Sequence, residues 1–226
     1  VLDNSLPKYI NSPENIVYSK ARNLYGLNVA KNSKSKNLII VEGYMDTVSL
    51  HQRGIDNVVA SCGTALTEAQ GRLLRKYAEK VIISYDSDSA GQAATLRGLE
   101  ILNSLGCDIR ILQMEGAKDP DEYVIRYGNA RFNNLVEKAI SLTEFKVKVL
   151  KNSLDLENVN DKIKFLNEVS KILSKVDNNM EREVYIDKIS LEYKVSKDAI
   201  YAEINKLLYA NSKAEQKLEK KVAPIN

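Results

Sequence analysis

Histidine, cysteine, proline and tryptophan are scarce in this sequence of 226 residues, which has one histidine, two cysteines, four prolines and no tryptophan. A single histidine, His51, argues against a histidine-rich metal centre and against a Ser-His-Asp triad. Cys62 and Cys107 have apolar neighbours and no metal-ligand spacing, so we interpret them as small buried hydrophobic residues of a reducing compartment. No apolar run approaches the roughly 18–20 residues of a membrane-spanning helix, and no signal peptide is recognisable. We therefore expect a soluble, cytoplasmic protein.

An excess of charge of one sign is absent as well. The chain carries 33 lysine and arginine residues against 30 aspartate and glutamate residues, a net charge of +3. A nearly neutral chain gives no overall electrostatic argument for nucleic acid, so any nucleic-acid surface must come from local clustering. The composition, 44% hydrophobic and 28% charged, is typical of a globular protein with a core. The opening residues include no initiator methionine, and we interpret the chain as a fragment of a longer protein.

Short aliphatic runs alternate with helical patterns in the first half of the chain. The runs predict strands at residues 38–41, 58–60, 81–83 and 109–112. Helical spacing predicts helices between them, at residues 45–53, 67–79 and 90–105, with Thr67 as the N-cap of the second. Strands that alternate with helices form βαβ units, so the predicted fold class is α/β, with a mainly parallel sheet flanked by helices.

After Pro120 the sequence predicts helices and no further strand. These helices span residues 121–127, 130–152, 160–175, 180–194 and 197–209, with Ser196 as N-cap of the last. An all-helical subdomain therefore follows the α/β domain. The predicted boundaries are a polar, turn-rich segment at 1–36, the α/β domain at 37–128, the helical subdomain at 129–210 and a polar tail or linker at 211–226.

Acidic residues follow three of the predicted strands. They are Glu42 after the first strand, Asp46 one helical turn later, Asp86 and Asp88 after the third strand, and Asp119 and Asp121 after the fourth. Because the carboxyl ends of parallel strands meet at one edge of a sheet, we expect these carboxylates to lie close together. Such a cluster needs cations, and oxygen ligands beside a phosphate favour Mg²⁺ or Mn²⁺. The sequence therefore predicts a metal site for displacement at phosphorus.

Several of these residues have a plainer interpretation when each is taken alone. Asp46 could be a first-turn acid favoured by the helix dipole, and a lone acid after a strand is often a loop residue or an N-cap. Gly63 and Thr64 precede a helix and could either offer backbone N–H groups to a phosphate or serve only as the turn before the cap. Lys20 and Arg22 are basic, but their spacing alone assigns them no role.

Taken together, these segments resemble the bacterial DnaG-type primases over almost the whole α/β part. Residues 41–48, VEGYMDTV, are similar to the glutamate motif of that family, and residues 85–91, YDSDSAG, to its Asp-x-Asp motif, with Ser87 where the family usually has glycine. The other similar segments are the Gly-Thr-Ala loop at 61–67, the Asp-Pro-Asp segment at 118–122 and the end of the basic subdomain at 7–13 and 20–27. The glutamate and Asp-x-Asp motifs alone would indicate only the Toprim fold, and the upstream segments narrow the resemblance to primase.

The resemblance implies an enzyme that makes short RNA primers on single-stranded DNA from ribonucleoside triphosphates. The implied residue roles are catalytic metal ligation by Glu42, Asp86 and Asp88; support of a second Mg²⁺ or Mn²⁺ ion or of the triphosphate by Asp46, Asp119 and Asp121; and contact with nucleotide or nucleic acid by Lys8, Lys20, Arg22, Gly63 and Thr64. It further implies that zinc belongs to an N-terminal domain outside this sequence, and that a C-terminal domain outside it contacts the replicative helicase. We expect the fragment alone to be inactive or weak, and the enzyme to act in the bacterial cytoplasm at the replisome, without a membrane partner.

Other functions share parts of this pattern. A Toprim nuclease or topoisomerase would carry the same acidic motifs, although a topoisomerase needs a nucleophilic tyrosine from another domain. A recombination-mediator scaffold or a phospho-receiver domain also gathers acids without nucleotidyl transfer. A receiver would need one phosphorylatable aspartate and a later lysine after a strand, which fits six distributed acids poorly.

Overall fold

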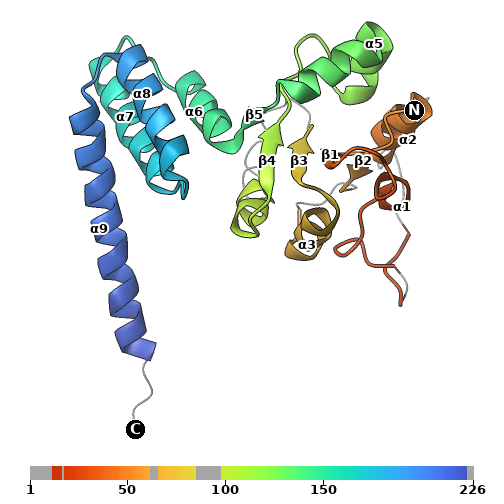
Figure 1. The fold of residues 1–226 in the computed structure, drawn as a ribbon, viewed down its shortest axis with the longest axis horizontal. Coiled ribbons are helices and arrows are strands. Elements are labelled where there is room, and N and C mark those ends of the chain that lie inside the picture. Colours follow the sequence, from red (N-terminus) through yellow and green to blue (C-terminus); the bar gives the residue numbers. More distant parts are fainter. Residues whose placement is uncertain (1–11, 17, 62–65, 85–97, 223–226) are drawn as a thin grey trace. The chain divides into compact units, whose positions relative to one another are not determined.

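The chain is described here by a computed structural model that covers residues 12–16, 18–61, 66–84 and 98–222. It divides into two compact units, Val1–Leu142 and Thr143–Asn226, referred to below as unit 1 and unit 2 (Figure 1). The sequence placed a domain boundary after residue 128, whereas the compact units divide after Leu142. The reason is that Phe132, beyond the predicted boundary, is fully buried in the core of unit 1.

Unit 1 is built around a five-stranded sheet with the order β2-β1-β3-β4-β5 (Figure 1). Its strands are β1 (Asn37–Val41), β2 (Val58–Ala60), β3 (Lys80–Ile83), β4 (Asp108–Ile111) and β5 (Ile140–Ser141). Strands β1 to β4 run parallel to one another, and β5 is antiparallel to β4. The predicted α/β class with a mainly parallel sheet is therefore confirmed.

The fifth strand corrects the prediction that no strand follows Pro120. Ile140 and Ser141 pair with Ile111 and Arg110 at the edge of the sheet. Two residues are too few to show the alternation that identifies a strand in a sequence. The predicted helix at 130–152 was also wrong, because Ile140 and Ser141 pair with β4 and interrupt it.

The helices of unit 1 pack against the sheet. They are α1 (Leu27–Ala30), α2 (Tyr44–Gln52), α3 (Glu68–Tyr77), a helical stretch at residues 98–104 and α5 (Pro120–Glu137). Ile39 and Val41 of β1 share one face of the sheet and pack in the same core cluster as Phe132 of α5. Two side-chain hydrogen bonds join α2 to α5 directly: the Ser49 hydroxyl donates to Asp121, and the Asn129 amide donates to the carbonyl oxygen of Arg53 at 2.6 Å.

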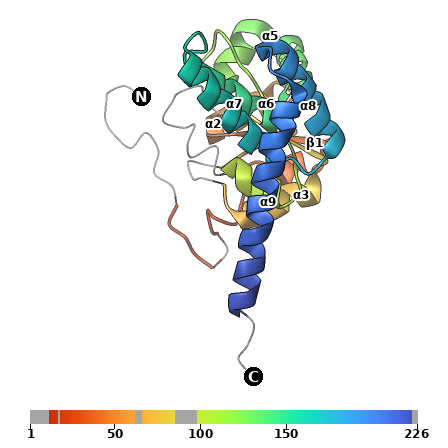
Figure 2. The same ribbon diagram turned by 90° about the vertical axis from the view of Figure 1, so that its left-hand side faces the viewer.

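Unit 2 consists of helices around a separate core. The helices are α6 (Leu142–Asn152), α7 (Val159–Ser174), α8 (Asn179–Tyr193) and the long α9 (Lys197–Val222), which is seen in Figures 1 and 2. Phe165, Val169 and Leu173 of α7 are almost completely buried and form the inner side of this helix. The predicted cap of α9 is confirmed, because the hydroxyl of Ser196 accepts a hydrogen bond from the N–H of Ala199 at 3.3 Å.

Helix α9 continues through most of the segment that was predicted to be a tail at 211–226. Its last residue is Val222, and the added turns are rich in lysine and glutamate. These residues have high intrinsic helix propensity, so a polar composition did not imply loss of helix. Among the residues that the structure describes, no helix has both the length and the apolar character that crossing a membrane requires.

Candidate active site

The candidate site begins at the carboxyl end of the central strand β1, where Glu42 directly follows Val41. The neighbouring strands end on either side of it. The N–H of Ser61, directly after β2, donates to the carbonyl oxygen of Val41 at 3.3 Å, and the N–H of Ser84, directly after β3, donates to that of Ile40 at 2.8 Å. Ser61 and Ser84, the last described residues after β2 and β3, therefore lie beside the strand that carries Glu42.

These two segments carry four of the predicted site residues, and they lie outside the described residues. Gly63 and Thr64 follow Ser61, and Asp86 and Asp88 follow Ser84; Lys8 also lies outside the described residues. The predicted trio of Glu42, Asp86 and Asp88 is therefore represented in the structure by Glu42 alone. Within the described part of the chain, no group of three acids, histidines or cysteines could hold a metal ion. What is described still suits a hard cation, because Glu42 and Asp46 place carboxylate groups within one helical turn of the carboxyl end of β1.

Asp46 lies in the first turn of α2, at the position where the plainer interpretation placed it. Its carboxylate accepts a hydrogen bond from the N–H of Gly43 at 3.2 Å, the bond that an N3 acid supplies in a capping box, while the N-cap glycine has no side chain to return it. A Cβ atom at Gly43 would lie 3.1 Å from this carboxylate, so glycine lets the side chain approach the backbone closely. Capping turns Asp46 back toward the residues that follow β1.

Asp119 and Asp121 both have protein partners at the start of α5. Asp119 is the N-cap, and its carboxylate accepts from the N–H of Glu122 at 2.8 Å. Asp121 accepts from the hydroxyl of Ser49 on α2. The two predicted acids of this loop therefore also have structural roles, one in beginning α5 and one in joining it to α2.

The loop before α5 is held by charge as well as by hydrogen bonds. The pKa of Glu122 is lowered, first because the backbone N–H of Lys118 donates to its carboxylate at 2.8 Å and second because the Arg126 guanidinium lies beside it. Arg126 pairs with Glu122 at 2.5 Å and also donates to the carbonyl oxygen of Gly116. The carboxylate of Glu122 thus fastens the loop that carries Asp119 to the first turns of α5.

Lys20 belongs to a short segment that is fixed to the sheet and to α3. At one end the N–H of Lys20 donates to the Glu14 carboxylate at 3.0 Å. At the other end Tyr25 and Ala60 form an antiparallel bridge with two backbone hydrogen bonds of 3.0 Å. Between these ends, the buried amide of Gln70 donates to the carbonyl oxygen of Lys20 at 3.1 Å. Residues 20–25 of the polar segment are thus fixed against the sheet and α3 of unit 1.

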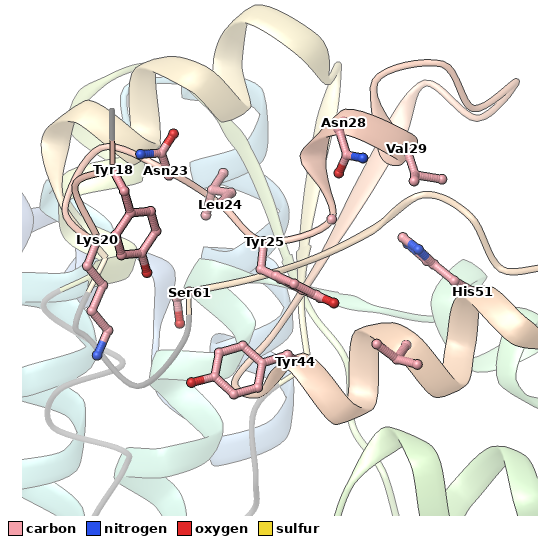
Figure 3. A pocket seen from close by; sticks show the side chains of 12 residues that line it. Tyr18, Lys20, Asn23, Leu24, Tyr25, Asn28, Val29, Tyr44, His51 and Ser61 are labelled. Atoms are coloured by element: carbon pink, nitrogen blue, oxygen red, sulfur yellow. The ribbon is translucent and has the colours of Figure 1, made fainter. Parts of the chain in front are cut away.

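A cavity of about 460 Å³ opens between this segment and α2. It is lined by Tyr18, Lys20, Asn23, Leu24, Tyr25, Gly26, Asn28, Val29, Tyr44, Val48, His51 and Ser61. Figure 3 shows the ammonium of Lys20, the phenols of Tyr18 and Tyr44 and the hydroxyl of Ser61 directed toward one end of the cavity. Among its described lining residues Lys20 carries a positive charge and there is no carboxylate, which favours an anionic ligand.

Aromatic rings give the cavity a second chemical character. The rings of Tyr25 and Tyr44 meet edge to face, with centroids 5.5 Å apart and an interplanar angle of 71°. Tyr44 is the first residue of α2 and stands two positions after Glu42, so the cavity adjoins the end of β1. Phosphate-binding and aromatic groups together suit a nucleotide or a single strand of nucleic acid.

The structure distinguishes two basic residues, Lys20 and Arg22, that the sequence analysis treated together. Lys20 lines the cavity, whereas Arg22 is exposed and does not line it. Sequence reasoning missed Tyr18, Tyr25 and Tyr44 as lining residues. The latter two stand inside segments that were singled out as motifs, and an aromatic residue next to a phosphate-binding motif was the available signal.

Comparison with known proteins matches both units to families. A model described as Toprim-like matches residues 39–124, and one described as the DnaB-helicase binding domain of primase matches residues 143–198. The second match lies inside unit 2, whereas the sequence analysis expected helicase contact in a domain outside this chain.

Relatives and solved structures point to the same family. The chain is 50% identical over 202 residues to a DNA primase of Clostridium acetobutylicum, covering 89% of this chain and 34% of that protein. It resembles a DnaG catalytic core with 33% identity and a TM-score of 0.71, covering 88% of this chain and 66% of that one. It also resembles a DnaG primase catalytic domain bound to single-stranded DNA, with 34% identity and a TM-score of 0.70, covering 84% and 63%. The chain spans about a third of the length of the curated relatives that it matches.

Proposed function

Since the chain belongs to the bacterial DnaG-type DNA primase family, in the Toprim-containing part of its RNA polymerase domain, we propose that it forms the catalytic core of an enzyme that makes short RNA primers on single-stranded DNA. The proposal rests above all on the Lys20 cavity, which adjoins the strand end that carries Glu42. In the reaction a primer 3′-oxygen attacks the α-phosphorus of a ribonucleoside triphosphate, and pyrophosphate leaves.

The cavity residues are proposed to bind and orient the nucleotide. The ammonium of Lys20 contacts its phosphates, and the phenols of Tyr18 and Tyr44 donate hydrogen bonds beside them. The ring of Tyr25, which is 46% exposed, offers an apolar surface to the base or the ribose. Arg22 lies on the outer side of the same segment, where it can contact the template backbone.

The acids are proposed to hold divalent cations, with Mg²⁺ or Mn²⁺ as the ions. Glu42, Asp86 and Asp88 would be the ligands of the ion nearest the reacting phosphorus. Bound there, the ion supplies orientation of the attacking oxygen and neutralisation of developing charge. Asp121 accepts the Ser49 hydroxyl through Oδ1 alone, and a carboxylate has further lone pairs for a second ion, so we assign Asp121 a part in nucleotide affinity.

Steady-state kinetics in the complete primase test these assignments. Asp86→Ala should abolish synthesis without rescue by added Mn²⁺, because it removes a ligand beside the chemistry. Asp121→Ala should mainly raise KM for the nucleotide, and Ser49→Ala is its control, since it removes the partner and keeps the carboxylate. If Asp86→Ala loses only apparent affinity while Asp121→Ala loses turnover, the two assignments are reversed.

The same assays separate the rival functions. A Toprim nuclease or topoisomerase would cleave or relax DNA without extending a primer, and a recombination scaffold would do neither. Template-dependent incorporation of ribonucleotides that requires both Asp86 and Lys20 is the expected result. Residues 1–226 alone should polymerise weakly or not at all, because they span only about a third of the length of the curated relatives. In the cell we place the enzyme in the cytoplasm, at the replication fork.

A contact between unit 2 and the replicative helicase is the second proposal. Its support is the matched family model, together with apolar side chains on α8. Met180, Val184 and Leu191 are 78%, 66% and 85% exposed, and their spacing puts them on one side of the helix. Exposed apolar residues that share a helix face are typical of a docking surface.

A charge placed on this face tests the helicase proposal. The double variant Val184→Asp and Leu191→Asp should weaken helicase affinity about tenfold or more, because it puts carboxylates into an apolar contact. The double variant Asn160→Asp and Asn167→Asp on α7 is the control, since it adds the same two charges at other exposed positions. Primer synthesis without helicase should be unchanged. Unaltered helicase affinity in the α8 double variant would exclude this face.

A further inference from the structure

The buried side chain of Gln70 connects helix α3 to the segment that carries Lys20. Gln70 is fully buried at the third position of α3. Its carbonyl oxygen accepts from the N–H of Thr67 at 3.0 Å, and its amide nitrogen donates to the carbonyl oxygens of Lys20 at 3.1 Å and Asn23 at 2.9 Å. Both N–H groups of the side-chain amide are thus directed at the backbone of one segment, 50 and 47 residues earlier in the chain.

Thr67, the N-cap of α3, adds a third bond to the same segment. Its hydroxyl accepts from the N–H of Gln70 at 3.1 Å and donates to the carbonyl oxygen of Ala21 at 2.6 Å. Thr67 and Gln70 therefore form a reciprocal capping box and also bind three of the four carbonyl groups between residues 20 and 23. Capping α3 needs only the bonds within the box.

The chemical identity of residue 70 shows whether its side chain serves only the cap of α3 or also the upstream segment. Glutamate at this position would close the box as well and would gain from the helix dipole. It would have no N–H groups for the carbonyl oxygens of Lys20 and Asn23, and its buried charge would face their negative ends. Glutamine is therefore the residue that the upstream segment requires, beyond what the helix requires.

Lys20 and Asn23 both line the cavity, so their backbone positions set where their side chains can reach. The bond from the N–H of Lys20 to Glu14 is exposed, whereas the bonds from Gln70 are half-buried and come from a side chain that is itself fully buried. A long, flexible side chain binds better when its backbone is already fixed, because less freedom is lost on binding. Gln70 is placed to supply that fixation without touching a ligand.

We propose that Gln70 is a positioning residue of the primase: it acts through the backbone of residues 20–23 to hold Lys20 and Asn23 at the cavity, and it thereby sets the affinity for the nucleoside triphosphate. The inference rests on the proposed function of the cavity. It predicts a loss in nucleotide binding that is larger than the loss in turnover.

The test uses Gln70→Glu in the complete primase. This variant keeps the size of the side chain and its bond from Thr67 but loses both donors to the segment. We expect KM for the ribonucleoside triphosphate to rise about tenfold, with kcat changed less than about threefold. Leu74→Ala on the same helix is the matched control, because it removes a fully buried core side chain that has no polar atom to hydrogen-bond the segment. A rise in KM of the same size in Leu74→Ala would mean that lost stability alone explains the effect, and would overturn the proposal.

A second pair of variants keeps the proposal testable if Gln70→Glu does not fold. Thr67→Val removes the bond to Ala21, and Thr67→Ser restores a hydroxyl at that place. Serine should keep KM near the wild-type value, and valine should raise it. Equal KM values for the two variants would contradict the proposal.

Hydrogen exchange adds a measurement that does not depend on activity. In Gln70→Glu a peptide covering residues 18–25 should exchange faster, while a peptide covering residues 98–104 should stay close to wild type. Unchanged exchange in residues 18–25 would overturn the inference.

Lys20→Ala separates a failure of the positioning role from a failure of the proposed function. If Lys20→Ala leaves KM unchanged, the cavity is not the nucleotide site; if it raises KM and Gln70→Glu does not, only the positioning role fails.

Discussion

Residues 18–25, which carry Lys20, are called the Lys20 segment below. Gly26 follows this segment and packs closely against α2 and β2. Its φ is +80°, and a Cβ atom there would lie 2.7 Å from the Cγ2 atom of Thr47 and 2.9 Å from the carbonyl oxygen of Val58. Gly26→Ala should therefore lower the free energy of unfolding by about 2–4 kcal/mol, since it adds both a left-handed backbone strain and a steric overlap. Urea unfolding of the purified protein measures the loss.

Gly54 provides the matched control for this prediction. It has nearly the same φ, +83°, but a Cβ atom there would meet nothing within 4 Å. Gly54→Ala should cost only the backbone term, about 1–2 kcal/mol. Equal costs for the two variants would mean that close packing of the segment against α2 and β2 is not what requires glycine at position 26.

Glu122 makes the loop before α5 sensitive to acid. Its folded-state pKa lies below the ordinary value, chiefly through the Lys118 N–H, so its stabilising effect is present above the ordinary carboxyl pKa and is lost as the pH falls through the lowered value. Acidification should therefore loosen the loop. The pKa itself is checked by carbon-detected NMR titration of the Glu122 carboxylate. In Glu122→Gln, the exchange protection of the loop should lose this pH dependence; a Glu122 carboxylate that titrates at or above the ordinary value would contradict the assignment.

At the scale of a secondary-structure element, Gly128 produces a bend in α5. Gly128 has φ 80° and ψ 165°, a conformation inside the helix that residues other than glycine rarely adopt. The bend lets Tyr123 and Phe132, on either side of it, enter the same core. Gly128→Ala should cost about 1–3 kcal/mol in the free energy of unfolding, again measured with urea.

The control for Gly128 lies on the same helix. Asn133 is exposed, and Asn133→Ala should change the free energy of unfolding by no more than about 0.5 kcal/mol. Because nothing lies within 4 Å of a Cβ atom at Gly128, a loss there would come from the backbone rather than from overlap. A loss below about 0.5 kcal/mol would show that α5 can straighten without disturbing the core.

At the scale of the whole molecule, the two compact units should respond differently to metal. Under the proposed assignment only unit 1 carries the ligands Glu42, Asp86 and Asp88. Saturating Mn²⁺ or Mg²⁺ should raise the free energy of unfolding of unit 1 by about 1–3 kcal/mol, since the ion binds the folded site, and leave unit 2 unchanged. Hydrogen exchange resolved by peptide distinguishes the core peptides of the two units.

Glu42→Gln is the control for the metal prediction. It keeps the size of the side chain but removes one anionic ligand, so the stabilisation by metal should shrink or vanish. A stabilisation that is equal in both units, or that survives Glu42→Gln and Asp86→Ala, would assign the metal to a different place.

Local patterns in the sequence were sufficient for much of this molecule. Aliphatic residues predicted four of the five strands of this sheet within one residue at each end, and β1 to β3 are buried along almost their whole length, as expected of strands covered on both faces. Thr67 and Ser196 were recognised as N-caps because capping depends on a few neighbouring residues. The position of Glu42 at the carboxyl end of a central parallel strand was also predicted from the sequence, because a short aliphatic run directly precedes it.

Contacts between distant residues were decided only by the tertiary structure. The edge strand β5 exists because β4 pairs with it, and the cavity exists because the Lys20 segment, the start of α2 and Ser61 meet in space. The clearest case is Gln70, which reads in sequence as an ordinary N3 residue of a helix. Its two partners stand 50 and 47 residues earlier, beyond the reach of any periodic pattern, because a side-chain amide selects carbonyl groups by position in space and not by distance along the chain.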